Sequence, residues 1–247
     1  MGLVRGNNED NFYINGRYKE DITEPFSRIT DHARRDEYLY AVCDGMGGED
    51  CGEEAALTAV ETLAQYEKAG FDGKLAAYVS RTNQLICEKM KRMGGARIGT
   101  TLALLYIKDN QAMSCNLGDS RTYLFRDCKL RQLSKDHTQA QRLVDLGLLK
   151  QNEAKKHKDR NKLTQHLGIF PNELVIEPYI SEMITLMQGD VFLLCSDGLT
   201  DMVSDDGIAR VLLSEAEAET MSEMLVEQAI QNGGKDNVTI IVVQVKG

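Results

Sequence analysis

Four aspartates stand at the ends of apolar segments that are far apart in the sequence. Asp44 follows YLYAVC, Asp119 follows SCNLG, Asp197 follows VFLLCS, and Asp236 precedes NVTIIVV. A single aspartate at such a place is commonly a turn residue. Each of these four, however, lies in a glycine-containing segment, and glycine allows close backbone approach and exposes carbonyl oxygens. The pattern therefore predicts that the four carboxylates converge at one site.

Converging carboxylates cannot all stay ionised unless a positive charge lies between them. Oxygen-only ligation favours Mg²⁺ or Mn²⁺, and the chain lacks a matched His/Cys set of the kind that binds zinc. Arg5 stands shortly before Glu9 and Asp10, and its planar guanidinium suits a phosphate dianion. Acids for a metal and an arginine for a phosphate together indicate phosphoryl chemistry.

The segments between these residues predict an α+β fold. Apolar, β-rich runs predict strands at 38–43, in several short pieces within 100–134, and at 174–187, 190–196 and 237–245. Apolar positions at helical spacing predict helices at 53–68, 74–93, 205–213 and 215–231. Turns within 100–134 are so short that they can join only antiparallel strands. Antiparallel sheet with segregated helices is expected, rather than a doubly wound fold.

Six short glycine-containing motifs follow one another along the chain. They are Arg5-Gly6-Asn7-Asn8-Glu9-Asp10, Asp44-Gly45-Met46-Gly47-Gly48, Gly99-Thr100-Thr101, Gly118-Asp119-Ser120-Arg121, Ser196-Asp197-Gly198 with Asp201, and Gly234-Lys235-Asp236-Asn237-Val238-Thr239. In this order they resemble the type-2C (PPM) metal-dependent serine/threonine protein phosphatases, particularly the short bacterial members. The resemblance implies one domain over residues 1–247, folded as a four-layer α-β-β-α sandwich with two central antiparallel sheets.

The resemblance also implies a role for each acid. Asp44 would bridge two metal ions and the Gly45 carbonyl would bind the second ion. The remaining ligands of the two-ion core would be Asp197 and Asp236 for the first ion, and Glu9 and Asp10, directly or through water, for the second. A weaker third site would use Asp119, with Asp197 and Asp201, as in bacterial relatives. Asn237 would orient the ligands rather than bind an ion.

The mechanism that follows is hydrolysis of phosphoserine and phosphothreonine monoesters without a phosphoenzyme. A water held between two ions about 3.5 to 4 Å apart would attack phosphorus in line. Arg5 would hold the phosphoryl group. The expected partners are phosphoproteins and a bacterial-type serine/threonine kinase that this enzyme opposes.

Two features depart from the family pattern. Met46 stands where many eukaryotic relatives have a histidine proposed as general acid, and a thioether cannot donate a proton to the leaving oxygen. Relatives also have a first strand before the arginine segment, whereas Arg5 is the fifth residue here. If Met1 is the true start, we expect an edge strand to be missing and the arm that carries Arg5 to be loose.

A basic segment lies where bacterial relatives have a flap, at about 136–168. Its residues 150–162 carry six Lys/Arg against two acids. The segment is either a solvated helix face or a mobile cover that draws phosphopeptides to an acidic cleft. His157 and Asn161 are its candidate substrate contacts.

Two other functions are compatible with parts of the sequence: a cysteine-dependent phosphatase and a catalytically silent binding module. Cys115 and Arg121 have the C-x5-R spacing of cysteine-dependent phosphatases, but that loop needs glycine-rich backbone that curls into a helix, and a strand is expected after Arg121. The stronger alternative is a catalytically silent relative that serves as a binding or regulatory module. Such relatives normally lose one aspartate of the metal set, and Asp44, Asp197 and Asp236 are all present.

Charge and hydropathy exclude some partners. The 247-residue chain has a formal charge of −9, which disfavours nucleic-acid binding. Its longest apolar runs are far shorter than the roughly 20 residues that a membrane helix needs. No signal peptide or myristoylation motif is visible at the N-terminus, so a cytoplasmic location is expected. The six cysteines form no CxxC pair and are expected to be reduced.

Overall fold

In the computed structural model, which describes residues 1–47 and 51–246, strand β3 (Glu37–Cys43) shows why the chain forms layers. Leu39, Ala41 and Cys43 pack in one apolar core. Tyr40 and Val42 pack in a second core on the other side of the strand. Because successive side chains of a strand point to opposite faces, a strand that is apolar on both faces must lie between two layers.

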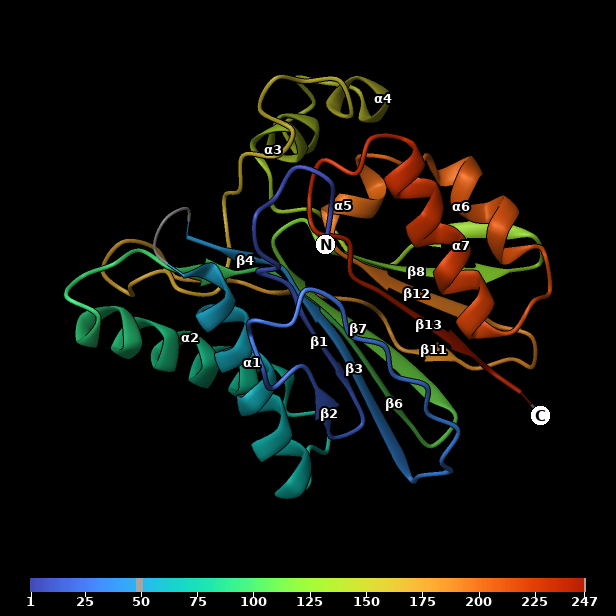
Figure 1. The fold of residues 1–247 in the computed structure, drawn as a ribbon, viewed down its shortest axis with the longest axis horizontal. Helices are drawn as coiled ribbons and strands as arrows, with labels where there is room; N and C mark the ends of the chain where they lie inside the picture. Colours follow the sequence, from blue (N-terminus) through green and yellow to red (C-terminus); the bar gives the residue numbers. More distant parts are fainter. Residues whose placement is uncertain (48–50, 247) are drawn as a thin grey trace.

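The first sheet contains β3 near its centre and has the order β10-β7-β6-β3-β1-β2, with β11 also paired to β7. Its strands besides β3 are β1 (Asn11–Ile14), β2 (Arg17–Tyr18), β6 (Leu102–Lys108), β7 (Gln111–Leu117), β10 (Tyr179–Ile180) and β11 (Ile184–Thr185). All the pairings in this sheet are antiparallel. Helices α1 (Gly52–Lys68) and α2 (Leu75–Arg92) cover one of its faces (Figure 1).

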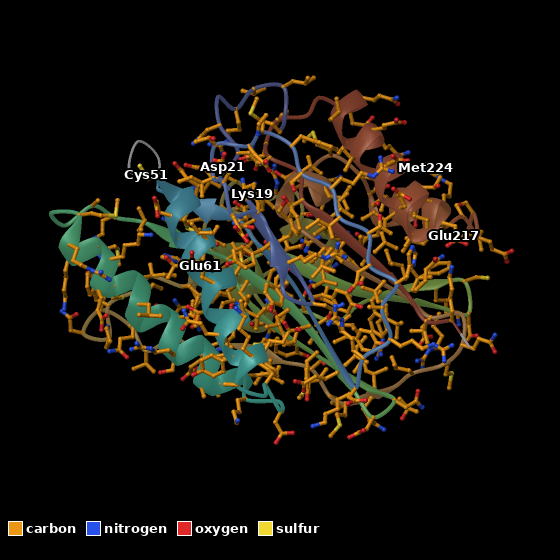
Figure 2. All side chains as sticks on the ribbon, turned by 60° about the horizontal axis from the view of Figure 1, so that its bottom comes forward. Lys19, Asp21, Cys51, Glu61, Glu217 and Met224 are labelled. Carbon is orange, nitrogen blue, oxygen red and sulfur yellow. The ribbon has the colours of Figure 1, made fainter. Side chains whose placement is uncertain are left out.

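The second sheet has the order β13-β12-β8-β9 and is also antiparallel. Its strands are β8 (Arg121–Arg126), β9 (Lys129–Gln132), β12 (Val191–Cys195) and β13 (Ile240–Gln244). Helices α6 (Asp205–Leu212) and α7 (Ala218–Gln231) pack on its outer face, and its inner face meets the first sheet. Glu61 on α1 and Met224 on α7 accordingly lie on opposite sides of the sheets (Figure 2). The expected four-layer sandwich is confirmed.

Within the described residues, five short elements lie outside the four layers. A two-stranded ribbon pairs β4 (Gly45–Met46) with β5 (Gly99–Thr100). Helix α5 (Asp197–Thr200) follows β12 directly. Helices α3 (Gln139–Asp145) and α4 (Gln151–Ala154) form a separate projection beside α5 (Figure 1), which is the segment that the sequence assigned to a flap.

The structure differs from the sequence expectations in a few places. Strands β1 and β2 were not expected, although Asn15 and Gly16 between them both have positive φ and Asn-Gly is a strong hairpin signal. Within 174–187, only β10 and β11 are strands. Gly48 of the second motif lies outside the described residues. Among the described helices, none is long and apolar enough to span a membrane.

Residues 1–6 form no strand, but they contact the loop before β13. The Leu3 N–H donates to the Gly234 carbonyl at 2.7 Å. A Cβ added to Gly2 would meet the Asp236 carbonyl at 2.1 Å, so only glycine fits there. These two contacts attach the arm that carries Arg5 to the loop before β13.

Candidate active site

Asp44 lies directly after β3, and three hydrogen bonds fix its backbone. Its N–H donates to Oγ1 of Thr101 at 3.0 Å. Its carbonyl accepts from the Thr101 N–H at 2.9 Å and from Oγ1 of Thr100 at 3.0 Å. Because the backbone groups are satisfied by Thr100 of β5 and by Thr101, which lies between β5 and β6, the Asp44 carboxylate is left for other partners.

Gly45 brings two further segments against this strand end. A Cβ at Gly45 would lie 2.5 Å from the carbonyl oxygens of both Glu9 and Gly52, so the close approach requires glycine. The Glu9 carboxylate accepts a hydrogen bond from the Gly52 N–H, at the start of α1. The Glu9 N–H in turn donates to Oδ1 of Asn237 at 3.0 Å. Asn237 thus ties the N-terminal motif to the C-terminal one.

The carboxylates of four motifs surround Asp44. Burial raises the pKa of Asp44 well above its usual range, and the negative charges nearby raise it further; these charges belong to Asp10, Asp197, Asp119 and Asp236. Burial also raises the pKa of Asp197 to about 7, with the Asp201 and Asp236 charges as further causes. A shared site of this kind disfavours full ionisation unless a cation balances the charge. Asp119, Asp197 and Asp236 thus lie close enough to Asp44 for their charges to act on its carboxyl.

The donor set fits a hard divalent cation. All its members are oxygens, and Asp10 is only 2% exposed while its Oδ1 has no hydrogen-bond partner among the described residues. A buried carboxylate oxygen without a partner is costly, and a cation or its water would satisfy it. As they stand, however, no three His, Cys, Asp or Glu side chains within the described ranges are arranged to hold one ion.

Protein groups bind several of these carboxylates instead. The Asp10 Oδ2 accepts from Oγ of Ser196 at 3.0 Å, and Asp236 Oδ2 accepts from Arg5 Nη2 at 2.7 Å. The Arg5 side chain is half exposed, and the pKa of its guanidinium is raised by the hydrogen bond to Asp236. Arg5 therefore lies at the rim of the carboxylate group, next to one of its members.

A cavity of about 380 Å³ separates the carboxylates from the projection formed by α3 and α4. Asp119 and Asp197 line one part of it, and Lys155, Arg160 and Asn161 line another. Arg160 and Asn161 both donate to Oδ2 of Asp201, at 3.2 and 2.8 Å.

A second contact holds the same projection, because Lys155 pairs with Asp205 of α6 at 2.6 Å. His157 is placed differently from Asn161. Its Nδ1 accepts from the Asp159 N–H at 3.2 Å, and it is not among the residues that line the cavity. The structure thus brings Asn161 to the cavity and Asp201, but leaves His157 within the projection.

Arg121 and Cys115 do not form a cysteine-dependent site. Arg121 makes three hydrogen bonds to Asp136, at 2.6, 2.9 and 3.2 Å. Cys115 is fully buried on β7, and burial raises the pKa of its thiol to about 12. A buried thiol of this kind cannot act as a thiolate nucleophile near neutral pH.

Sequence reasoning missed two charged residues beside Glu9 and Asp10. Glu53 has a buried Oε2 without a hydrogen-bond partner in the described ranges, and its charge raises the pKa of Glu9, for which burial is the larger cause. Lys19 is 3% exposed, and its Nζ donates to the Asn8 carbonyl at 2.9 Å. Burial lowers the pKa of Lys19. The only sequence signal for Glu53 is its place just after the second motif, and Lys19 has none.

Comparisons of the chain with known proteins agree on one family. The model of the protein phosphatase 2C family matches residues 19–238. The chain is 36% identical to serine/threonine protein phosphatase PstP of Mycobacterium tuberculosis, over 99% of this chain but 43% of that protein. It is 28% identical to serine/threonine phosphatase stp of Listeria monocytogenes, over 98% of this chain and 92% of that protein.

A solved structure extends the likeness to the fold. The catalytic domain of PstP in complex with two manganese ions matches with a TM-score of 0.79 and 35% identity, over 100% of this chain and 95% of that chain. The chain thus spans less than half of the whole PstP protein, but nearly all of its catalytic domain. The protein belongs to the protein phosphatase 2C family.

Proposed function

We propose that this protein is a metal-dependent phosphatase of phosphoserine and phosphothreonine in proteins. The observation that carries the proposal is the convergence of Asp10, Asp119, Asp197 and Asp236 around the buried Asp44. The names of the relatives, all serine/threonine phosphatases, support it. The aspartates also favour an enzyme over the silent binding module. Such modules normally lose one aspartate of the metal set, and this chain retains Asp44, Asp197 and Asp236.

The metal ligands are proposed from the same arrangement. Two Mg²⁺ or Mn²⁺ ions would be held by Asp44 and the Gly45 carbonyl, together with Asp197, Asp236, Glu9 and Asp10. A third ion would use Asp119, Asp197 and Asp201. When bound, such ions acidify water and stabilise the charge that develops on phosphoryl oxygens. The presence of two manganese ions in the PstP domain supports a two-ion core.

Residues other than the metal ligands would bind the phosphoryl group and hold the ligands in place. Arg5 at the rim would exchange Asp236 for the phosphoryl group, which it binds as a bidentate donor. Asn237 would keep the Glu9 segment in place through the bond to the Glu9 N–H. The burial of Cys115 makes a phosphoenzyme on this thiol unsuitable. Because Met46 cannot donate a proton, the leaving serine or threonine oxygen would take its proton from water.

We further propose that residues 1–247 form one phosphatase domain in which about 136–168 is a flap. Its support is the cavity between this segment and Asp197, which can hold part of a phosphoprotein. Asn161 and Arg160 are then the candidate substrate contacts, and His157 is a weaker one because of its position. A bacterial-type serine/threonine kinase as the opposing partner and a cytoplasmic location stay predictions.

Hydrolysis of a phosphothreonine peptide tests the proposal. Phosphate release by the purified protein would be measured with EDTA, with Mg²⁺ and with Mn²⁺, beside the Asp44→Asn variant. Release that requires a metal and is lost in the variant is the expected result. A folded protein without release in any metal would support the silent binding module instead.

A further inference from the structure

The hydroxyl of Thr101 connects two of the carboxylate-bearing turns. Its Oγ1 accepts the Asp44 N–H at 3.0 Å and lies 2.6 Å from Oγ of Ser120, the residue after Asp119. Thr101 is 2% exposed and Ser120 is 0% exposed. One buried hydroxyl therefore stands between the end of β3 and the turn between β7 and β8.

The packing around Gly118 makes this contact possible. Gly118 has φ of +95°, and a Cβ there would lie 2.7 Å from Cγ2 of Thr101. The turn that carries Asp119 therefore rests directly on the Thr101 side chain. His137 holds the turn from the other side, because its Nδ1 accepts the Gly118 N–H at 3.2 Å and its own N–H donates to the Gly118 carbonyl at 2.9 Å.

We infer that Thr101 is a positioning residue that fixes Asp44 and Asp119 relative to each other through its hydroxyl. The inference rests on the proposed metal-dependent function, in which Asp44 belongs to the two-ion core and Asp119 to the third site. Among the described residues, the hydrogen bonds of the Thr101 hydroxyl go to the Asp44 N–H and to Ser120, not to a carboxylate. Thr101 acts on the backbone of Asp44 and on Ser120, and so sets the separation of two groups that repel each other.

The physical reason is that the Thr101 hydroxyl bonds to both turns at once. The Asp44 and Asp119 carboxylates are buried among like charges, so each is pushed away from its neighbours. Among the described residues, the Ser120 hydroxyl bonds only to Thr101. Loss of the Thr101 hydroxyl thus leaves the Asp44 N–H and the Ser120 hydroxyl unpaired in a buried place. It also removes the side-chain bridge between the two turns, although each turn keeps its own other hydrogen bonds.

The test measures Mn²⁺ binding by titration calorimetry on EDTA-treated protein, independently of catalysis. Thr101→Val keeps the shape and removes the hydroxyl, and Thr101→Ser keeps the hydroxyl and removes the methyl group. Thr122→Val is the matched control, since Thr122 is fully buried two residues after Ser120 and its Oγ1 has no partner in the described part of the chain. Thermal unfolding followed by circular dichroism shows that each variant folds.

Thr101→Val is expected to weaken Mn²⁺ binding by about tenfold, the lower end of what loss of a ligand-orienting partner does. Thr101→Ser and Thr122→Val are expected to bind like the wild type. Equal affinity of Thr101→Val and the wild type would overturn the inference. So would a Thr101→Ser variant as weak as Thr101→Val, because affinity would then follow methyl packing rather than the hydroxyl.

Ser120→Ala provides a second route if Thr101→Val does not fold. Its matched control is Ser114→Ala, whose buried Oγ also lacks a partner in the described residues. Ser120→Ala is expected to weaken Mn²⁺ binding, and Ser114→Ala is not. In the double variant Thr101→Val/Ser120→Ala, the loss should not exceed that of Thr101→Val alone, because Thr101→Val already removes the hydrogen bond that Ser120→Ala removes. Losses that multiply would contradict a shared hydrogen bond.

The same titrations separate this inference from the proposed function. A wild-type protein that binds Mn²⁺ but releases no phosphate would refute the phosphatase proposal, while the comparison of Thr101→Val with Thr122→Val would still decide the role of Thr101. A wild-type protein that binds no Mn²⁺ would overturn both.

Discussion

Arg5 Nη2 lies 2.7 Å from Asp236 Oδ2, so the predicted phosphate-binding cation and a predicted metal ligand form an ion pair across 231 positions of sequence. The pair joins the N-terminal arm to the loop before β13. Arg5 can hold this carboxylate or a phosphate with the same face of its guanidinium. Its position at the rim, half exposed, leaves it accessible to a substrate.

Arg5→Ala is expected to raise KM for a phosphothreonine peptide by about tenfold, which is the usual value of a charge-assisted hydrogen bond, with a much smaller change in kcat. The reason is that Arg5 binds the phosphoryl group without acting on the reacting water. Steady-state kinetics would measure both constants. Arg17→Ala is the control, since Arg17 is equally exposed and pairs with Asp31. An unchanged KM would show that Arg5 does not contact substrate.

Asp44→Asn should reduce kcat/KM by at least about 100-fold, because it removes charge that acts on the transition state. The same change should raise the melting temperature of the EDTA-treated protein at about pH 8. The reason is that burial and neighbouring carboxylates raise the pKa of Asp44, so its ionised form destabilises the folded protein above that pKa. Asp21→Asn, at an exposed position (Figure 2), serves as control. A lower melting temperature for Asp44→Asn alone would contradict the assigned repulsion.

His137 should make stability fall in mild acid. Burial lowers its pKa from the usual 6.5. Below about pH 6.5 the unfolded chain binds a proton that the folded chain does not, so the free energy of unfolding decreases as pH falls toward the folded pKa. His137→Asn should therefore lose less unfolding free energy than the wild type between about pH 7.5 and about pH 5.5. Urea titrations would measure this, with exposed His32→Asn as control; equal losses would exclude His137.

The contact between Lys155 and Asp205 should restrain the proposed flap. Asp205→Asn breaks this exposed pair, which is worth at most about 1 kcal/mol, so the open form should become at most about fivefold more populated. Tryptic cleavage within 150–162 should accelerate accordingly. Glu217→Gln breaks the exposed pair with Lys246 elsewhere and should not change this rate. Identical cleavage rates for all three proteins would show that the pair does not hold the segment.

The pair of Arg121 and Asp136 should matter far more for stability. Its side chains are 18% and 13% exposed, and Asp136→Ala leaves a mostly buried guanidinium without its partner. We expect the free energy of unfolding to fall by about 3 kcal/mol, as measured by denaturant titration. Glu173→Ala, which breaks the exposed pair with Arg97, should cost under about 1 kcal/mol. Similar costs for the two variants would mean that solvent screens both pairs.

The local sequence determined the elements that have strong periodic signals. Tyr38 to Cys43 is apolar at every position, and a strand buried on both faces needs that pattern. A glycine and the end of an apolar segment accompany each of the four aspartates, and this pattern was enough to predict them as site residues. The Asn15-Gly16 turn was available as a signal for β1 and β2, but these strands are short and β1 begins directly after the first motif.

Only the tertiary structure decided which side chains share a partner. The sequence contains Arg5 and Asp236, or Thr101 and Ser120, as members of separate motifs, and nothing in their spacing states that they bond to each other. Long-range polar contacts depend on how two sheets and their loops pack, because a hydrogen bond forms only when its atoms lie within about 3 Å. The residue types in the sequence therefore determined which chemistry is available, namely carboxylates for a metal and an arginine for a phosphate. Packing placed Thr101 between two turns and left His157 away from the cavity.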